Sequence, residues 1–260
     1  MSVMTVATAT GRFVWHDLRT TDFGKAVAFY TELFGWRIAP DQIGGRTAHL
    51  FSHDGRAFGG VSQLTADQDG APSHWLCSIS VPDVDLAVAT AARLGGRIIT
   101  PPFDLVDVGR FSILADPTGA RFALAGNVDD APDVEQSEVV PGGICWHDLA
   151  TADPGDMTDF YADVVGWGAE PAEITGRQHT IFTSGERWAA GLFRKPNDVP
   201  ASTWAVYVRV ANIEATLDRV KRLGGSQVVG IIAIPDSGRF CGVADPTGAI
   251  FALHEPPPDL

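Results

Sequence analysis

The chain has 260 residues, a length that fits two units of about 130 residues, each large enough to bury a core without disulfides. Hydrophobic residues make up 45% of the chain and charged residues 20%, a composition that excludes a disordered or fibrous protein. The 32 acidic residues outnumber the 19 basic ones, and the net charge of −13 repels phosphate backbones. We therefore expect a packed protein without a nucleic-acid partner.

Cysteine usage and the N-terminal sequence indicate a cellular compartment. The three cysteines, Cys77, Cys145 and Cys241, are an odd number without C-x-x-C spacing, which argues against a disulfide framework or a zinc knuckle. The first residues lack a basic leader, and no run of roughly 18 apolar residues occurs. We expect a cytoplasmic protein that does not cross a membrane.

Strand-like and helix-like patterns alternate along the first half. A β-type run at 13–20 is followed by a segment with an Asp start signal, apolar residues at helical spacing and Gly35 as a stop. Three short β-type runs come next, and then the same order begins again. The expected strands are 13–20, 37–43, 46–53, 56–64, 74–81, 97–103, 109–116 and 120–126, and the expected helices are 22–36 and 84–96. Each half is therefore expected to hold two modules of the order βαβββ.

The second half repeats the first. WHDLRTTD returns as WHDLATAD and AFYTELFGW as DFYADVVGW, each 131 residues later, and ADPTGARFAL returns as ADPTGAIFAL after 129 residues. Such agreement over a whole half indicates a tandem duplication. The stretch between the halves is acidic and carries no basic residue, as expected for a solvated linker. We expect a first domain at 12–126, a linker at 127–142 and a second domain at 143–256.

The paired βαβββ order, the helix ends FYTELFGW and FYADVVGW, and the terminal DPTG resemble the vicinal-oxygen-chelate superfamily. This superfamily includes glyoxalase I, extradiol dioxygenases and bleomycin-resistance proteins. Tandem members of this length, of the glyoxalase-like or hydroxylase type, look similar throughout. The resemblance implies an α+β fold in which four βαβββ modules form two tandem domains with cupped mixed sheets. For an enzyme, it implies a glyoxalase-like lyase or a dioxygenase or hydroxylase.

The resemblance also allows a test for the metal that many members use. In those members four side chains, usually His and Glu, hold a divalent ion in the cup. The corresponding positions here are Trp15, Gly60, Leu76 and Ala123 in the first half and Trp146, Gly191, Ala205 and Ala252 in the second. None of these side chains coordinates a metal. We therefore predict that neither cup has the usual metal site, and we expect no cofactor.

Strand alternation predicts what lines the cups instead. If Trp15 faces the first cup, Asp17 does so too, and Trp146 brings Asp148 into the second cup. An aromatic floor beside a carboxylate is typical of a ligand site, although both tryptophans could simply pack the core. The same alternation on the fifth strand of each half places a further set of side chains in the cups: His74 in the first, and Tyr207 and Arg209 in the second.

Two further pairs recur in both halves. Arg110 and Arg239 precede the strand that ends in ADPTG, where they could clamp an anionic or carbonyl group or form salt bridges with Asp107 and Asp236. His16 and His147 have the opposite parity from the cup residues. We expect these histidines on the helix side, in a structural role near Tyr30 and Tyr161.

Three functions follow from these patterns. The first is a glyoxalase/bleomycin-resistance-like protein that binds a neutral or cationic small molecule in an aromatic-floored cup without the usual metal. The second is a metal-dependent lyase or dioxygenase whose ligands have moved, for instance to His74, Asp17 or His254. The third is a structural or interaction protein with filled cups. A monomer or a homodimer is expected, because the duplication can satisfy module pairing inside one chain.

Overall fold

The computed structural model describes residues 10–65, 70–127, 140–196, 199 and 201–258. The expected linker 127–142 falls largely outside the described residues. The first half contains β1 (Phe13–Thr20), α1 (Phe23–Phe34), β2 (Arg37–Ile43), β3 (Arg46–His53), β4 (Arg56–Gln63), β5 (His74–Ser80), α2 (Val84–Arg93), β6 (Arg97–Leu105), β7 (Gly109–Ala115) and β8 (Arg121–Gly126). The second half contains β9 (Ile144–Thr151), α3 (Pro154–Val165), β10 (Gly168–Ile174), β11 (Arg177–Ser184), β12 (Arg187–Arg194), β13 (Thr203–Arg209), α4 (Ile213–Arg222), β14 (Ser226–Gln227), β15 (Ile232–Ile234), β16 (Gly238–Ala244) and β17 (Ile250–Glu255).

Each half forms one sheet. The first has the order β2-β3-β4-β1-β5-β8-β7-β6, and the second has the order β10-β11-β12-β9-β13-β17-β16-β14, with β15 paired to β16. The β1–β4 and β5–β8 pairs are parallel, whereas β1 and β5 are antiparallel and join the two modules of the half. The expected α+β fold with tandem, mixed, half-barrel sheets is therefore confirmed.

Local signals explain where the helices begin and end. The side chain of Asp22 accepts a hydrogen bond from the Lys25 amide at 3.0 Å, and Gly35 ends α1 in the left-handed conformation with φ of 71°. The same arrangement recurs at α3, with Asp153 before the helix and Gly166 after it. The start and stop signals of the sequence are thus confirmed in both halves.

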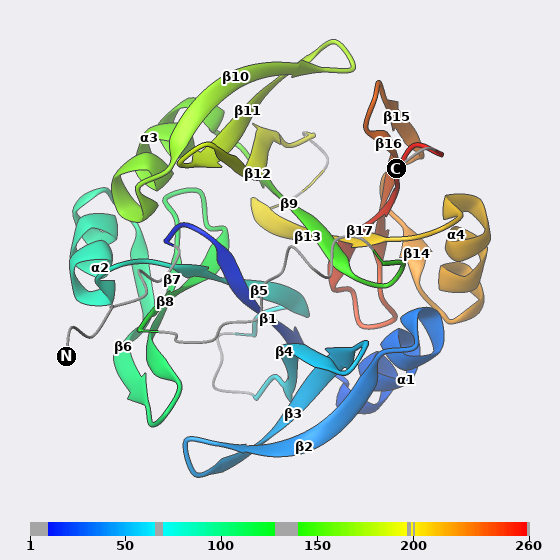
Figure 1. Ribbon diagram of the computed structural model, residues 1–260, viewed down its shortest axis with the longest axis horizontal. Coiled ribbons are helices and arrows are strands. Elements are labelled where there is room, and N and C mark those ends of the chain that lie inside the picture. The colour runs from blue at the N-terminus through cyan, green and yellow to red at the C-terminus, as the bar shows by residue number, and fades with distance from the viewer. Residues whose placement is uncertain (1–9, 66–69, 128–139, 197–198, 200, 259–260) are drawn as a thin grey trace, which may run out of the picture.

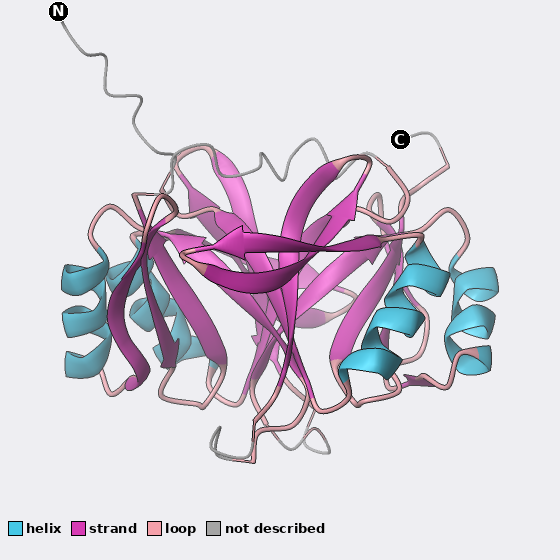
Figure 2. Ribbon diagram, turned by 90° about the horizontal axis from the view of Figure 1, so that it is seen from below, coloured by secondary structure: helices cyan, strands magenta, loops and turns pink. Residues whose placement is uncertain are grey.

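The two sheets pack back to back, and each helix covers the seam between them. In Figure 1 the first sheet occupies the lower part of the molecule and the second sheet the upper part, with α1 beside α4 and α2 beside α3. Figure 2 shows the helices on the two outer flanks with the strands between them. The Phe29 ring of α1 lies 6.1 Å from the Phe251 ring of β17, and the Phe122 and Phe160 rings form a similar contact at 6.2 Å. One buried hydrophobic cluster therefore spans both halves.

Reciprocal hydrogen bonds fasten the halves together. Trp36 Nε1 of the first half donates to the Gly142 carbonyl of the second at 2.7 Å. Trp167 Nε1 of the second half donates to the Gly11 carbonyl of the first at 2.8 Å. Because each half is both donor and acceptor, the contact has the two-fold pattern of an isologous interface.

The DPTG segment forms the expected tight turn and also contacts the other half. Asp116 Oδ1 accepts hydrogen bonds from the Thr118 amide at 2.9 Å and the Ala120 amide at 3.0 Å. Its second oxygen accepts from the hydroxyl of Tyr161, in the other half, at 3.1 Å. The motif is therefore part of the interface. No helix among the described residues has the length and apolar character needed to span a bilayer.

Candidate functional site: two unequal cups

The floor of each cup carries a hydrogen-bonded Trp and Asp. Trp15 Nε1 donates to Asp17 at 3.3 Å, and Trp146 Nε1 donates to Asp148 at 2.8 Å. All four side chains are half-buried, as expected for the concave face of a sheet. The strand register places Asp17 between Gly60 and Leu76, and the structure thus brings together the side chains that alternation assigned to one face.

The glycines opposite these carboxylates make room for them. A Cβ on Gly60 would lie 2.4 Å from Asp17 Oδ1, and a Cβ on Gly191 would lie 2.0 Å from Asp148 Oδ1. Both separations are far below van der Waals contact, so a side chain at either position would displace the carboxylate. These are two of the positions at which the resemblance implies a metal ligand, and the aspartates fill that space instead.

The carboxylate of the second cup is held more firmly than its counterpart. The Tyr207 hydroxyl donates to Asp148 at 2.5 Å, in addition to the bond from Trp146. Burial raises the pKa of Asp148, and the hydrogen bonds from Tyr207 and Trp146 oppose that rise. In the first cup the residue equivalent to Tyr207 is Ser78. Asp148 is therefore fixed in a preorganised network.

A cysteine and a histidine also meet in the second cup. Cys145 Sγ lies 3.6 Å from Nδ1 of His254, and His254 Nε2 lies 2.7 Å from the Ser237 carbonyl oxygen. The equivalent residues of the first half, Val14 and Ala125, are buried in apolar contact. The second cup thus has a polar Cys–His pair at the positions where the first cup has apolar Val and Ala side chains.

The first cup is basic at one end. Arg19 lies opposite His74 in the β1–β5 register, and Arg121 lies on the same face of β8. Burial lowers the pKa of His74, and the charges of Arg121 and Arg19 lower it further. The Nε atom of Arg19 is buried and has no hydrogen-bond partner in the described part of the chain. The equivalents of the two arginines in the second cup, Ala150 and Ile250, are apolar.

The repeated arginines Arg110 and Arg239 are paired with carboxylates. Arg110 forms salt bridges with Asp85 at 2.6 Å and Asp104 at 2.9 Å. Arg239 pairs in the same way with Glu214 and, at 2.7 Å, with Glu255. The expected salt-bridge partners, Asp107 and Asp236, are wrong. Each guanidinium instead reaches a carboxylate on the neighbouring helix and another on a strand.

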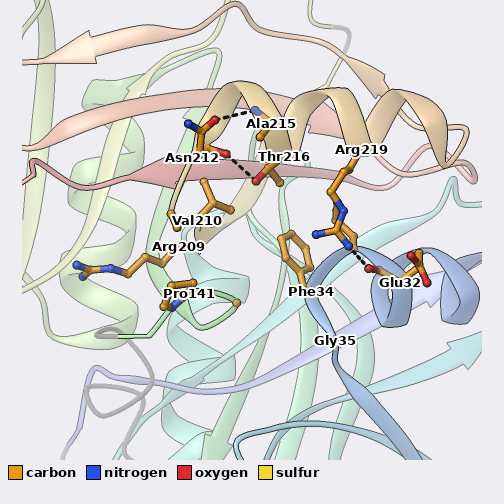
Figure 3. Close-up of a pocket in the computed structure, with 13 residues that line it drawn as sticks. Glu32, Phe34, Gly35, Pro141, Arg209, Val210, Asn212, Ala215, Thr216 and Arg219 are labelled. Atoms are coloured by element: carbon orange, nitrogen blue, oxygen red, sulfur yellow. Dashed lines mark hydrogen bonds between the residues drawn. The ribbon is translucent and has the colours of Figure 1, made fainter.

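An open groove lies between the end of α1 and the start of α4. It has a volume of about 480 Å³, and Figure 3 shows the side chains around it. The guanidinium of Arg219 donates to the Glu32 carbonyl, and Asn212 caps α4 by accepting from the Ala215 amide at 2.8 Å. Arg209 borders this groove at the end of β13, with its guanidinium directed away from Phe34 in the view of Figure 3.

His16 and His147 face each other across the interface. Their Nε2 atoms are 2.7 Å apart, and Nδ1 of His16 is 3.2 Å from the Phe58 carbonyl oxygen. The expected helix-side placement is correct, but the expected partners Tyr30 and Tyr161 are wrong. The histidines meet on the two-fold axis because the backs of the two sheets pack together. Burial lowers the pKa of His16 to about 4 and that of His147 well below its usual value, so both rings are neutral.

This histidine pair belongs to the one group of three or more metal-capable side chains found among the described residues. The third member is Cys77, all three are buried, and their ligand atoms lie within 4.8 Å of one another. The group lies between the sheets, outside both cups. Asp17 and His74 lie in the first sheet whereas His254 lies in the second, so these displaced-ligand candidates share no cup. Among the described residues, neither cup contains a group of three or more metal-capable side chains.

The fold and these cups define a tandem βαβββ protein with two concave sites. Residues 12–124 match the Glyoxalase/Bleomycin resistance protein/Dioxygenase superfamily, and residues 145–254 match the Glyoxalase-like domain. The chain belongs to the glyoxalase/bleomycin resistance/dioxygenase superfamily.

Relatives and solved structures agree with this assignment. "Putative glyoxylase CFP32" of Mycobacterium tuberculosis is 33% identical, over 94% of this chain and 94% of that protein. "Anthracycline biosynthesis protein DnrV" of Streptomyces peucetius is 31% identical, over 95% and 94% of the two chains. The Mn(II)-bound glyoxalase from Novosphingobium aromaticivorans has a TM-score of 0.63 at 16% identity, with 95% of this chain and 82% of that chain covered. The 2,3-dioxygenase LapB from Pseudomonas has a TM-score of 0.61 at 14% identity, with 97% and 96% covered.

Sequence reasoning missed the contact between Cys145 and His254. Cys145 lies in an apolar, strand-like run of the sequence, and strict alternation places it opposite in parity to Trp146. A bulge interrupts that alternation, because Trp146 pairs with Tyr207 whereas Ile144 pairs with Val208. The one sequence signal was the unequal repeat, in which Val and Ala are exchanged for Cys and His.

Proposed function

We propose that the protein binds a small molecule in its second cup and does so without the metal site usual in the superfamily. The observation that supports this most strongly is the network of Trp146, Asp148 and Tyr207. It holds a carboxylate on the concave face, in the space of a family metal ligand, and leaves a half-buried indole facing the cup.

The chemistry of this floor favours a neutral ligand with an aromatic or apolar surface. An indole face offers a stacking platform, and the Tyr207 oxygen remains able to accept a hydrogen bond while its proton bonds Asp148. The residues beside the floor on the neighbouring strands, Ala205 and Ala252, have small side chains. Anthracyclines are reasonable first probes, because one relative is named for anthracycline biosynthesis.

Tryptophan fluorescence tests this proposal. After a screen of aromatic compounds, we expect Trp146→Ala to weaken binding by about tenfold to a hundredfold, because truncation of a stacking ring removes about 1–3 kcal/mol. Trp188→Ala is the matched control, since that ring is 70% exposed and lies outside the floor. If a folded Trp146→Ala variant binds with unchanged affinity, Trp146 only packs the core. That result would favour a structural or interaction protein whose cups are filled by side chains.

Elemental analysis tests the metal statement separately. After dialysis against a weak chelator, we expect less than stoichiometric Zn, Mn, Fe or Ni, and unchanged ligand affinity. One tightly held ion per domain with chelator-sensitive binding would instead support the lyase or dioxygenase with displaced ligands.

A second candidate ligand concerns the first cup. The buried Arg19 Nε, which has no hydrogen-bond partner among the described residues, together with Arg121 and His74 favours a small molecule that carries a carboxylate. Arg121→Ile introduces the residue type found at the equivalent position 250, so the change is compatible with the fold. We expect it to weaken binding of carboxylate-bearing probes by at least tenfold and to leave the second cup unaffected. Equal affinity in the variant would contradict this ligand class.

A further inference from the structure

The histidine of the second cup is held in one tautomer. A carbonyl oxygen only accepts hydrogen bonds, so the 2.7 Å contact with Ser237 requires that His254 Nε2 carries the proton. Nδ1 is then the basic nitrogen, and it faces Cys145 Sγ at 3.6 Å. A thiol, a basic nitrogen and a group that orients the ring are the three parts of an activated nucleophile.

The bulge in β9 takes Cys145 out of strict alternation, and its thiol contacts His254, which lies on the same face of β17 as the cup residue Ala252. The equivalent of Cys145 in the first half, Val14, also occupies a bulge and contacts Ala125 and Phe111, which line the first cup. In the resting state the Cys145 S–H has two acceptors at similar range, Nδ1 of His254 and the Tyr207 carbonyl oxygen at 3.5 Å. The thiol is therefore positioned but not locked onto either partner.

Cys145 is also the accessible cysteine of the chain. Cys77 and Cys241 are buried, whereas Cys145 is only half-buried. Burial raises the pKa of the Cys77 thiol strongly and that of Cys241 to about 11, so neither forms a thiolate at neutral pH. A thiol reagent therefore reports on Cys145 with two internal controls.

We propose that Cys145 and His254 form a nucleophilic pair in the second cup that adds to small electrophilic carbonyl compounds, with conjugated enones as the class to test. In the addition, the thiol proton moves to His254 Nδ1 and Sγ forms a bond with the β-carbon. The electron pair of the C=C bond shifts to give an enolate, which regains the proton from the imidazolium. No oxidant or leaving group is required. The inference concerns the same cup as the proposed function. The reactivity of the Cys145–His254 pair can be measured without the ligand of that cup.

Alkylation of the native protein by iodoacetamide tests the pair. The rate at Cys145 is followed by mass spectrometry between pH 6 and pH 9. We expect wild type to react at least about tenfold faster at pH 7 than His254→Gln, because an isolated thiol with a pKa of about 8.5 is only a few per cent thiolate there. His49→Gln is the matched control, since it removes a histidine from β3 of the first sheet, away from Cys145.

The other titratable or charged groups around the pair are Arg209, opposite His254 in the β13–β17 register, Tyr207 with its partner Asp148, and Glu255 with its partner Arg239. The pKa of Tyr207 is raised well above its usual value, so its hydroxyl stays protonated over this range. Asp148 retains its two side-chain donors in all the variants. A pH profile that shifts only in His254→Gln therefore identifies the imidazole as the base. Equal rates and equal profiles in wild type and His254→Gln would overturn the proposal.

A conjugated enone, 2-cyclohexen-1-one, tests the substrate class. We expect a single adduct at Cys145 in wild type and its loss in Cys145→Val with His254→Ala. This double variant restores the residue types found at positions 14 and 125, so it is expected to fold. Rapid alkylation without any enone adduct would overturn the substrate class. Failure of ligand binding to the Trp146 floor with an intact His254-dependent rate would contradict only the proposed function.

Discussion

The interface between the sheets and the linings of the cups differ in how much of the duplicated sequence they keep. At the interface the repeat is kept, with His16 facing His147 and Trp36 and Trp167 forming equivalent bonds. In the cups the Trp–Asp floor is kept, but the side chains around it differ, with Cys145 and His254 where the first cup has Val14 and Ala125. At the interface, a residue of one half packs against the other half and both copies are constrained. The cup residues that differ between the halves contact their own sheet, so a change in one copy requires no matching change in the other.

The largest expected effect follows from the interface. Trp36→Ala or Trp167→Ala should lower the free energy of unfolding by about 3–5 kcal/mol, because each removes a buried indole together with a bond to the other half. Both halves should unfold in one transition, since one core spans them. Denaturant unfolding followed by circular dichroism and by fluorescence measures both quantities. Trp188→Ala is the control, with less than about 0.5 kcal/mol expected. Separate transitions for the two halves would contradict the shared core.

The histidine pair predicts acid sensitivity of the same interface. In the unfolded chain His16 is protonated below about pH 6.5, whereas in the folded protein the buried imidazole is protonated only below about pH 4. The unfolded state therefore binds more protons between these values, and stability falls as the pH falls. We expect a loss of about 2 kcal/mol from His16 between pH 7.5 and pH 5.

Comparison with His16→Gln isolates this contribution from that of the carboxylates. The variant has no imidazole to titrate at position 16, so its stability should fall less steeply over the same pH range. Parallel stability curves for wild type and His16→Gln would show that the buried pair does not govern the acid response.

The smallest expected effect concerns the cup floors. Tyr207→Phe removes one donor from Asp148 and should destabilise the protein by about 1 kcal/mol, whereas Ser78→Ala at the equivalent position should have less than about 0.5 kcal/mol of effect. The pKa of Asp148 should rise in Tyr207→Phe, because the lost hydrogen bond favours the charged form. Carbon-detected NMR titration measures that shift. A pKa that stays unchanged would show that Tyr207 does not stabilise the carboxylate.

The strands, helices and cup floors could be predicted from the sequence because their signals are local. Asp22 and Gly35 mark the ends of α1, and a period of two carries Trp15 and Asp17 to one face. The partner of His16 could not be predicted, since it lies 131 residues away and depends on how two sheets dock. The orientation of the Cys145 side chain could not be predicted either. It depends on a bulge of one residue in β9, and the amino-acid pattern carries no signal for that bulge.

The reciprocal bonds of Trp36 and Trp167 have a consequence for how such a protein can specialise. Two separate copies of one half, held by the same contacts, would form a symmetric dimer in which a single gene dictates both cups. Any residue gained in one cup would then appear in the other. When both copies are part of one chain, the two cups can differ in sequence, and the shared core still holds the two halves together. One cup can then contain a thiol while the other contains two arginines. The molecule has the architecture of a symmetric dimer, but its two sites can differ as those of a heterodimer do.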